Sequence, residues 1–460
     1  MCPLIDEAKR FDWNCPRGCF KLGCMTNLPS AARQRRSCIP VYLFLIVGCL
    51  TIQIVPAAFA AAGESLWWKG NLHTHSLWSD GDDYPEMIVE WYKTNGYHFL
   101  ALSDHNIVLE GQKWIDAQTN KGGDAALEKY VKRFGADWVE RRERQGREQV
   151  RLKTLGEFRR MFEEPHRFLL IPSEELTDRH LTAPVHINVT NLRELIKPQG
   201  GSNVLEVMQN NVNAVLDQRK RTGQLMFPHL NHPNFGWGVT AEELMLVKGE
   251  RFFEVYNGHP SVHNEGDATH AGTERMWDIL LTWRLAVLDL DPIFGIGVDD
   301  SHHYHAKGPD KSNAGRGWVM VRASRLAPDE IITAMEAGEF YASSGVRLKE
   351  VRRSKGEYRV EIEPDEGATY TTQFIGTRKG FDRTNEPVRA ANGEALRVTH
   401  RYSKDVGEVF AEVKGATATY TLKGDEIYVR AKIVSSRPKN NPYRKGETEA
   451  AWTQPLVASR

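Results

Sequence analysis

Histidine and acidic residues follow a series of short apolar segments along this chain, and this recurrence constrains its fold more than any other feature. The first example is Asn71-Leu72-His73-Thr74-His75, with Asp80 five residues further on. Side chains in an extended strand repeat every two residues, so a His-x-His pair presents two imidazoles on one face. Imidazole and carboxylate groups together form the ligand set of zinc, manganese or iron. The segment therefore predicts part of a metal site at the end of a strand.

Similar groups recur after later apolar segments. They are Ser103-Asp104-His105-Asn106, Pro172-Ser173-Glu174-Glu175, His186, Asn231-His232-Pro233 and Asp299-Asp300-Ser301-His302. We expect strands at 66–72, 97–102, 168–171, 185–189, 225–227, 252–256, 293–298 and 318–321, and helices at 83–96, 204–216, 273–283 and 328–336. Alternating strands and helices, with polar groups at the carboxyl ends of the strands, are typical of a β/α barrel whose active site lies at that end.

Two further regions differ from this pattern. Residues 107–165 are rich in Lys, Arg and Glu, and we expect a helical insertion over the barrel mouth. Its ordinary interpretation is a solvated helix pair, and the alternative is a lid that brings cationic side chains to a substrate. Residues 346–460 contain β-rich runs at 358–362, 371–375, 409–413, 417–422 and 427–434. They predict a smaller C-terminal β-sandwich-like domain, which carries no ligand cluster.

The N-terminal 60 residues have the pattern of an export signal. Arg33, Arg35 and Arg36 precede a largely apolar run at 41–55, and Ala58-Phe59-Ala60 follows it. A basic region, an apolar region and an A-x-A site in this order are typical of a cleaved secretory signal. An uncleaved membrane anchor is the second interpretation and a lipoprotein signal at Cys49 the third. Met25 is an alternative start, which would leave residues 1–24 untranslated.

We therefore expect an exported protein, periplasmic or extracellular, with an outward-facing membrane-anchored protein as the alternative. All six cysteines lie within the first fifty residues, so a cleaved chain would carry no thiol that could mispair outside the cytoplasm. The 60 basic and 60 acidic residues balance, and no basic stripe interleaved with aromatic residues is present. The sequence thus gives no strong signal for nucleic-acid binding.

The ordered set His-x-His…Asp, Asp-His, Glu…His, His-Pro and Asp-x-His resembles that of the PHP superfamily, the polymerase and histidinol phosphatase group. The resemblance covers roughly residues 66–345. Members fold as a distorted seven-stranded β/α barrel, commonly hold two or three metals and are mostly phosphoesterases. The resemblance therefore implies an α/β fold with a distorted (β/α)7-type barrel, followed here by the β domain.

The resemblance also implies a ligand set by position. One metal would be held by His73, His75, Glu175 and Asp300; Glu175 would bridge to a second, held also by His186 and His232; a third would be held by Asp80, His105 and His302. In the family the glutamate precedes an aliphatic residue, which favours Glu175 over Glu174. The histidine precedes proline, which favours His232 over His229. The Asp-x-His spacing favours Asp300 over Asp299, and Asp80 stands where some members have histidine.

These features predict an exported, metal-dependent phosphoesterase that hydrolyses a small phosphomonoester or phosphodiester. Two or three divalent ions (zinc, manganese or iron, with magnesium as a further option) would activate water at neutral pH. His259 and His303 are candidates to protonate a leaving group. Arg179, Lys307 and Arg316 lie near the ligand loops and are candidates to bind phosphate, although ordinary surface charge is the simpler interpretation.

Two alternatives stay open. One is an amidohydrolase-like metal hydrolase that cleaves C–N or lactone bonds. The other is a non-catalytic surface-binding protein with structural metals, whose β domain contacts a glycan or a protein. Structural metal sites are saturated by protein ligands, whereas catalytic ones keep an open position. About nine ligands for three metals would leave open positions, which favours catalysis.

Overall fold

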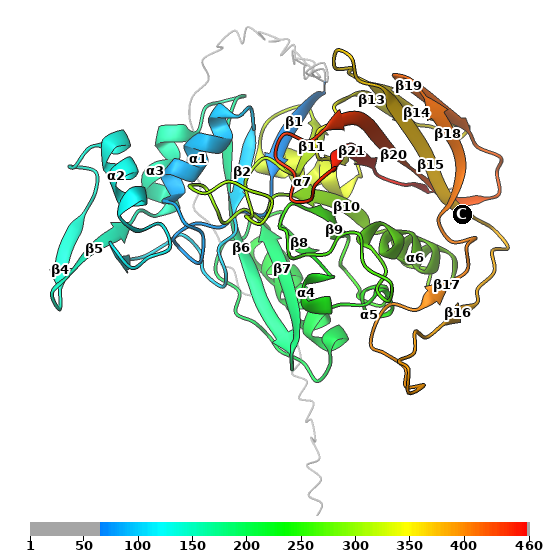
Figure 1. Cartoon of the computed structure of the whole chain (residues 1–460), viewed down its shortest axis with the longest axis horizontal. Helices are drawn as coiled ribbons and strands as arrows, with labels where there is room; N and C mark the ends of the chain where they lie inside the picture. Colours follow the sequence, from blue (N-terminus) through cyan, green and yellow to red (C-terminus); the bar gives the residue numbers. More distant parts are fainter. Residues whose placement is uncertain (1–64, 458–460) are drawn as a thin grey trace, which may run out of the picture. The chain divides into compact units, whose positions relative to one another are not determined.

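The computed structural model describes residues 65–457 (Figure 1). The export signal or anchor predicted for residues 1–60 lies outside these described residues. Among the residues described, no helix is both long enough and apolar enough to span a bilayer.

Nine strands form the curved sheet that supports the site. They are β1 (Leu66–Asn71), β2 (Phe99–Leu102), β6 (Leu169–His180), β7 (Ala183–Thr190), β8 (Phe227–Leu230), β9 (Phe252–Asn257), β10 (Phe294–Val298), β11 (Trp318–Ala323) and β12 (Phe340–Ser343). They pair in the order β10-β9-β8-β7-β6-β2-β1-β11-β12. Strand β10 also lies against β11 and β12, which brings the sheet round on itself. The predicted α/β class with a distorted barrel is confirmed.

The distortion has a specific cause. Strands β1, β2 and β6 are mutually parallel, and so are β8, β9 and β10. Between these two groups β7 runs antiparallel to both of its neighbours, because a tight hairpin joins it to β6 in place of a helix. The sequence predicted a strand at 185–189 but not its direction.

Helices pack around these strands. They are α1 (Pro85–Thr94), α4 (Val204–Thr222), α5 (Ala241–Leu244), α6 (Thr273–Ala286) and α7 (Pro328–Glu336), with a 3-10 turn, η1 (Phe235–Trp237). Helix α4 begins where the Asn203 side chain accepts a hydrogen bond from the Glu206 amide. It ends at Gly223, whose φ of 69° suits a residue without a Cβ.

The insertion at 107–165 is mixed, so its prediction as helical was wrong in part. It contains β3 (Lys113–Asp116), α2 (Gly123–Phe134), β4 (Arg141–Arg144), β5 (Arg147–Leu152) and α3 (Leu155–Phe162). The three strands form an antiparallel sheet in the order β3-β5-β4. Cross-strand charge pairs such as Arg141–Glu148, 2.8 Å apart, stabilise it where β-branched residues would be expected. Its charge-rich composition therefore concealed the strands.

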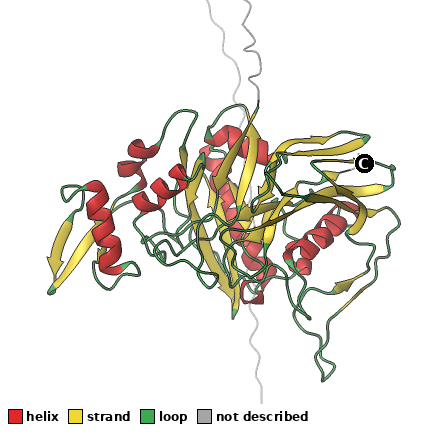
Figure 2. Ribbon diagram, turned by 45° about the horizontal axis from the view of Figure 1, so that its top comes forward, coloured by secondary structure: helices red, strands yellow, loops and turns green. Residues whose placement is uncertain are grey.

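The C-terminal region is antiparallel. Its strands are β13 (Leu348–Arg353), β14 (Glu357–Ile362), β15 (Tyr370–Arg378), β16 (Asn385–Glu386), β17 (Arg401–Tyr402), β18 (Glu408–Lys414), β19 (Thr417–Thr421), β20 (Glu426–Pro438), β21 (Thr448–Thr453) and β22 (Leu456–Val457). Strands β21-β20-β15-β18 continue the barrel sheet through β12, and β13-β14-β19 form a second sheet. Val360, Phe374 and Val429 belong to the apolar core of this region. Figures 1 and 2 show these strands on the side of the barrel away from the insertion.

Candidate metal centre

The first ligand segment directly follows β1. The Asn71 side chain accepts a hydrogen bond from the His73 amide at 2.9 Å, and the His75 amide donates to the Ser301 carbonyl at 3.0 Å. The Asp300 amide donates in turn to the His73 carbonyl at 3.0 Å. The residues after β1 and the residues after β10 thus hold each other in place. This pairing sets His73 and His75 beside Asp300.

Asp300 itself has an unusual backbone. Its φ of 49° lies in the left-handed region, which residues other than glycine rarely adopt. Such a conformation costs about 1–3 kcal/mol and persists where the surrounding structure imposes it, often at functional sites. Here it directs the carboxylate toward His73 and His75.

Four donor atoms from this region lie close to the two imidazoles of the His-x-His pair. The Nε2 atoms of His73 and His75 are 3.1 Å apart, and each is 3.2 Å from Asp300 Oδ1. Glu175 Oε2 is 3.4 Å from the first nitrogen and 3.2 Å from the second. An ion about 2.0 Å from the donor atoms of His73, His75 and Glu175 fits over the triangle that they form, and this is the usual distance from zinc to an imidazole nitrogen or carboxylate oxygen. These three residues form one group whose donor atoms lie within 4.8 Å of one another, and Asp300 forms a second such group with His73 and His232.

A second group surrounds the other side of the Glu175 carboxylate. Its Oε1 lies 2.9 Å from His186 Nδ1 and 3.5 Å from His232 Nε2, and its Oε2 lies 2.9 Å from His105 Nδ1. Among the described residues, neither Glu175 Oε2 nor His186 Nδ1 has a hydrogen bond, because the atoms are close but misaligned. Buried polar atoms normally find a hydrogen-bond partner. Donor atoms that are close but misaligned suit a shared cation. Glu175 is placed to bridge two such cations.

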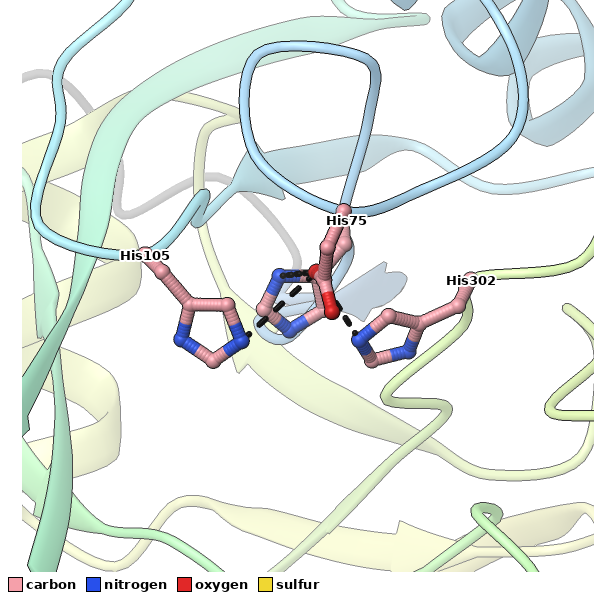
Figure 3. Close-up of side chains that lie close together, drawn as sticks. His75, His105 and His302 are labelled. Carbon is pink, nitrogen blue, oxygen red and sulfur yellow. Dashed lines mark ion pairs between the residues drawn. The ribbon is translucent and has the colours of Figure 1, made fainter. Parts of the chain in front are cut away.

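Asp80 lies among a third group of donor atoms at the edge of the site. Its Oδ1 lies 3.6 Å from His75 Nδ1, 3.6 Å from His105 Nε2 and 3.2 Å from His302 Nε2. Figure 3 shows these three imidazoles converging from three separate segments of the chain. The Asp80 side chain is 38% exposed, so this side of the site is open to solvent.

The loop that carries Asp80 is ordered by Asp104. The Asp104 carboxylate accepts hydrogen bonds from the Ser76 amide and hydroxyl, each at 2.8 Å, and from the Ser79 hydroxyl at 2.6 Å. It therefore acts on the loop between His75 and Asp80.

The structure brings all nine predicted ligands together. Of the three alternatives that the sequence offered, Glu174 and Asp299 lie in other surroundings, whereas His229 lies close to Glu254 behind His73. Glu174 points away from Glu175 and accepts a hydrogen bond from the Ile196 amide at 2.7 Å. Asp299 accepts hydrogen bonds from the amides of the loop at 315–317 and from the Tyr92 hydroxyl.

Two residues that sequence reasoning missed lie behind His73. Glu254, in the middle of β9, has Oε1 2.6 Å from His73 Nδ1 and 3.5 Å from His229 Nε2. Its other oxygen accepts from the His232 amide at 2.7 Å and from the Asn257 side chain at 2.8 Å. A charged residue inside the apolar run Phe252–Asn257 was the signal that could have revealed it. His229, set aside in favour of His232, belongs to this buried layer.

Charge explains why these groups stay together. Burial acts to lower the pKa of His75, but the close carboxylates of Asp300 and Glu175 raise it to about 10. Burial also opposes ionisation of Glu254, yet the close imidazoles of His73 and His229 lower its pKa to about 2. The carboxylates thus favour positive charge at this point, which protons or divalent cations can supply.

The two candidate proton donors differ in position. The His259 ring lies 5.5 Å from that of His302, and burial lowers its pKa to about 4, so it is neutral at pH 7. His303 lies outside the groups of donor atoms, because its Nδ1 is 3.0 Å from the Ser312 hydroxyl and its side chain lines a different cavity.

The basic residues that were candidates to bind phosphate have different surroundings. Arg316 is buried, and its guanidinium donates to the carbonyls of Gly258, Gly308 and Asn441. It therefore stabilises loops and is not free to bind phosphate. Lys121, from the insertion, is the cation beside the ligands, with its Nζ 3.3 Å from Asp80 Oδ2.

No protein-family model matches the chain, and no curated protein matches it. Seven chains of solved structures are similar to this one, including the following two. One is a two-domain protein from Bacteroides vulgatus, described as containing a predicted PHP-like metal-dependent phosphoesterase; it is 14% identical, with 85% of this chain and 95% of that chain covered and a TM-score of 0.36. The other, from Bifidobacterium adolescentis, is named for a metal-dependent phosphoesterase activity inferred for it; it is 15% identical, with coverage of 59% and 96% and a TM-score of 0.25.

Both similar structures thus carry names of the kind that the motif order predicted. At 14–15% identity, the assignment of a metal centre in this chain rests on the geometry described above.

Proposed function

We propose that this protein is a metal-dependent phosphoesterase that hydrolyses a small phosphomonoester or phosphodiester outside the cytoplasm. One observation carries the proposal: the donor atoms of His73, His75 and Glu175 lie 3.1–3.4 Å from one another, which suits one divalent ion, and Asp300 Oδ1 lies 3.2 Å from both imidazoles. The open edge at Asp80 favours catalysis over a purely structural metal.

Divalent ions in such a site lower the pKa of water and neutralise phosphate charge as it builds up in the transition state. The side chains supply the rest. Glu175 is placed to hold two ions at a fixed separation, because its two oxygens face different groups of histidines. Asn231 keeps this carboxylate in position by donating to Oε1 at 2.9 Å. His259 is neutral at pH 7, and its Nδ1 accepts from the Ser261 amide at 3.1 Å, so its Nε2–H group can donate a hydrogen bond to water or substrate at the site edge.

The test begins with the full chain freed of metal by a chelator and reloaded separately with zinc, manganese or magnesium. We expect at least two equivalents to bind with one of these metals and hydrolysis of p-nitrophenyl phosphate or bis-p-nitrophenyl phosphate. Amide and lactone substrates, assayed in parallel, separate the amidohydrolase-like alternative. Less than one equivalent of bound metal, or cleavage of amides alone, would overturn the proposal.

A matched pair of variants sharpens this test. Glu175→Gln removes the bridging carboxylate, so metal binding and hydrolysis should both fall by at least a hundredfold. Glu174→Gln is the control, because burial raises the pKa of Glu174 to about 8 and glutamine resembles its protonated form. That variant should keep its metal and its activity.

A further inference from the structure

A second cavity lies apart from the metal centre. It has a volume of about 880 Å³ and is formed by β1, α1, the loop at 303–315 and the loop at 440–445. None of the nine predicted metal ligands lines it. Its volume falls in the range of about 300–1,000 Å³ that is usual for small-molecule sites. Trp91, Tyr97 and Trp318 form its aromatic walls.

The charged side chains that line this cavity are basic. Lys69, Lys307 and Lys445 line it, and no aspartate or glutamate among the described residues does so. Lysines around a concave surface raise the local concentration of anions. The cavity therefore favours a negatively charged occupant.

Lys69 stands out because it lacks an anionic partner. Its Nζ lies 3.9 Å from the ring centroid of Tyr97 and 4.0 Å from that of Trp318. Within residues 65–457 no carboxylate forms an ion pair with this ammonium group, and burial lowers the pKa of Lys69 to about 8. Aromatic faces stabilise a cation by only about 0.5–2 kcal/mol, less than a buried charge normally requires.

Tyr97 offers a second unpartnered group. This side chain is 2% exposed, and its hydroxyl has no hydrogen-bond partner among the described residues. A buried hydroxyl without a partner is unfavourable by about 1–3 kcal/mol. The cavity thus presents an ammonium group without an anionic partner, and the hydroxyl of one of its wall residues is buried without a hydrogen bond.

We propose that this cavity binds a small anion that carries a planar ring. The anionic group pairs with Lys69, and the ring stacks on Trp91, because offset aromatic stacking suits a flat apolar surface. A nucleoside monophosphate and an aromatic carboxylate share this chemistry. The inference does not depend on the metal centre.

Calorimetric titration of the full chain in the presence of a chelator tests this directly. The probes are adenosine monophosphate, phenyl phosphate, benzoate and inorganic phosphate. At least one probe with a ring should bind with a Kd below about 1 mM, and inorganic phosphate at least tenfold more weakly. Comparison of adenosine monophosphate with benzoate distinguishes a nucleotide ligand from a carboxylate ligand.

Three variants locate the binding site. Lys69→Gln should weaken binding of the best probe at least tenfold, and Trp91→Ala at least fivefold. Lys355→Gln is the control, since this exposed lysine lies in the turn between β13 and β14, outside the cavity. Loss of binding in His75→Ala would place the probe at the metal centre and overturn the proposal.

A second readout avoids variants that fold poorly. A lysine-acylating reagent at pH 8 should modify Lys69, and the best probe should protect that residue by at least fivefold, as measured by peptide mass spectrometry. The proposal is overturned if the probes with a ring bind no better than inorganic phosphate, if Lys69→Gln binds normally, or if no probe protects Lys69.

Discussion

At the scale of single residues, Glu254 shows how a side chain without a place in the predicted ligand set can govern the site. Metal-binding histidines usually donate their second ring nitrogen to a carboxylate, which fixes the ring and increases its basicity. Glu254 contacts His73 in this way at 2.6 Å. Both its oxygens are in use, because Oε2 accepts from the His232 amide and from Asn257.

Glu254→Gln should therefore lower metal affinity by about 10–100-fold, the usual effect of losing such a carboxylate. Glutamine at this position carries no negative charge, and it places an NH2 group against two hydrogen-bond donors. Competition with a chromogenic chelator measures the affinity. Glu250→Gln is the matched control, because this buried carboxylate contacts only the amides of Arg251 and Phe252. Equal affinities in the two variants would contradict the role assigned to Glu254.

Glu250 also gives a prediction about pH and stability. Burial raises its pKa from 4.5 to about 8. Between these values the folded chain binds more protons at this site than the unfolded chain, so Glu250 makes stability fall as pH rises. Glu250→Gln removes this effect. Its free energy of unfolding relative to wild type should therefore increase from pH 5 to pH 8 by at least about 1.4 kcal/mol, the equivalent of one pKa unit.

Urea unfolding at the two pH values measures this difference. Glu206→Gln serves as the control, because the carboxylate of Glu206 is exposed and hydrogen bonds to Ser202 lower its pKa. That variant should not gain stability between pH 5 and pH 8. A constant difference between wild type and Glu250→Gln would show that Glu250 is ionised in the folded chain.

At the scale of elements, the insertion supplies the cation nearest to the ligands. Lys121 precedes α2 and pairs with Asp80, and its side chain is 58% exposed. Under the proposed function, this ammonium group also attracts the phosphate of a substrate. Exposed charge pairs contribute about 0.2–1 kcal/mol. Lys121→Met should therefore raise KM for a phosphate ester about two- to fivefold, leaving metal content unchanged.

Steady-state kinetics at low and high salt test this role. The increase in KM should shrink as salt rises, because exposed charges are screened. Lys132→Met removes an exposed lysine from the same insertion and should leave KM unchanged. If both variants behave alike, the insertion supplies only general surface charge.

The elements also show what the sequence could and could not predict. Strands β2 and β10 are apolar and buried throughout, so their positions were clear from composition alone. Helix α7 was predicted with its observed bounds, because Pro328 marks its start. The direction of β7 depends on which strand it pairs with, and that information is absent from its own residues.

The ligands were predictable for a related reason. His73, His105 and Asp300 each follow a strand directly, so their order along the chain reflects their order around the barrel. Glu254 lies within a strand and lacks that signal. The strands of the insertion were missed because β4, Arg141–Arg144, consists only of charged residues and so has none of the usual strand formers.

At the scale of the whole described chain, the barrel and the C-terminal strands are joined covalently, by a shared sheet and by a buried ion pair. Strand β12 pairs with β21, so the two regions have continuous backbone hydrogen bonds. Arg430, on β20, donates two hydrogen bonds to the Asp278 carboxylate, on α6, at 2.8 and 2.7 Å. The Tyr428 hydroxyl adds a hydrogen bond to the same carboxylate at 2.8 Å.

This junction predicts that the two regions unfold together. Arg430→Met leaves the Asp278 carboxylate buried without its partner, which should destabilise the protein by about 3–5 kcal/mol. The double variant Asp278→Leu/Arg430→Met should lose less, because an apolar pair of similar volume leaves no isolated charge. Arg352→Met, at a side chain 71% exposed, should change stability by no more than about 0.5 kcal/mol.

Calorimetry and the loss of bound metal, followed during the same heating, distinguish one cooperative unit from two independent ones. If the regions are coupled, Arg430→Met lowers the temperature at which metal is released by the same amount as the calorimetric Tm, although Arg430 touches no ligand. If they are independent, the variant splits the calorimetric transition and metal release stays at the wild-type temperature. The shared sheet favours the first outcome, because opening β20 and β21 exposes the edge of β12, which pairs with β11 and, through it, with β1 beside the metal ligands.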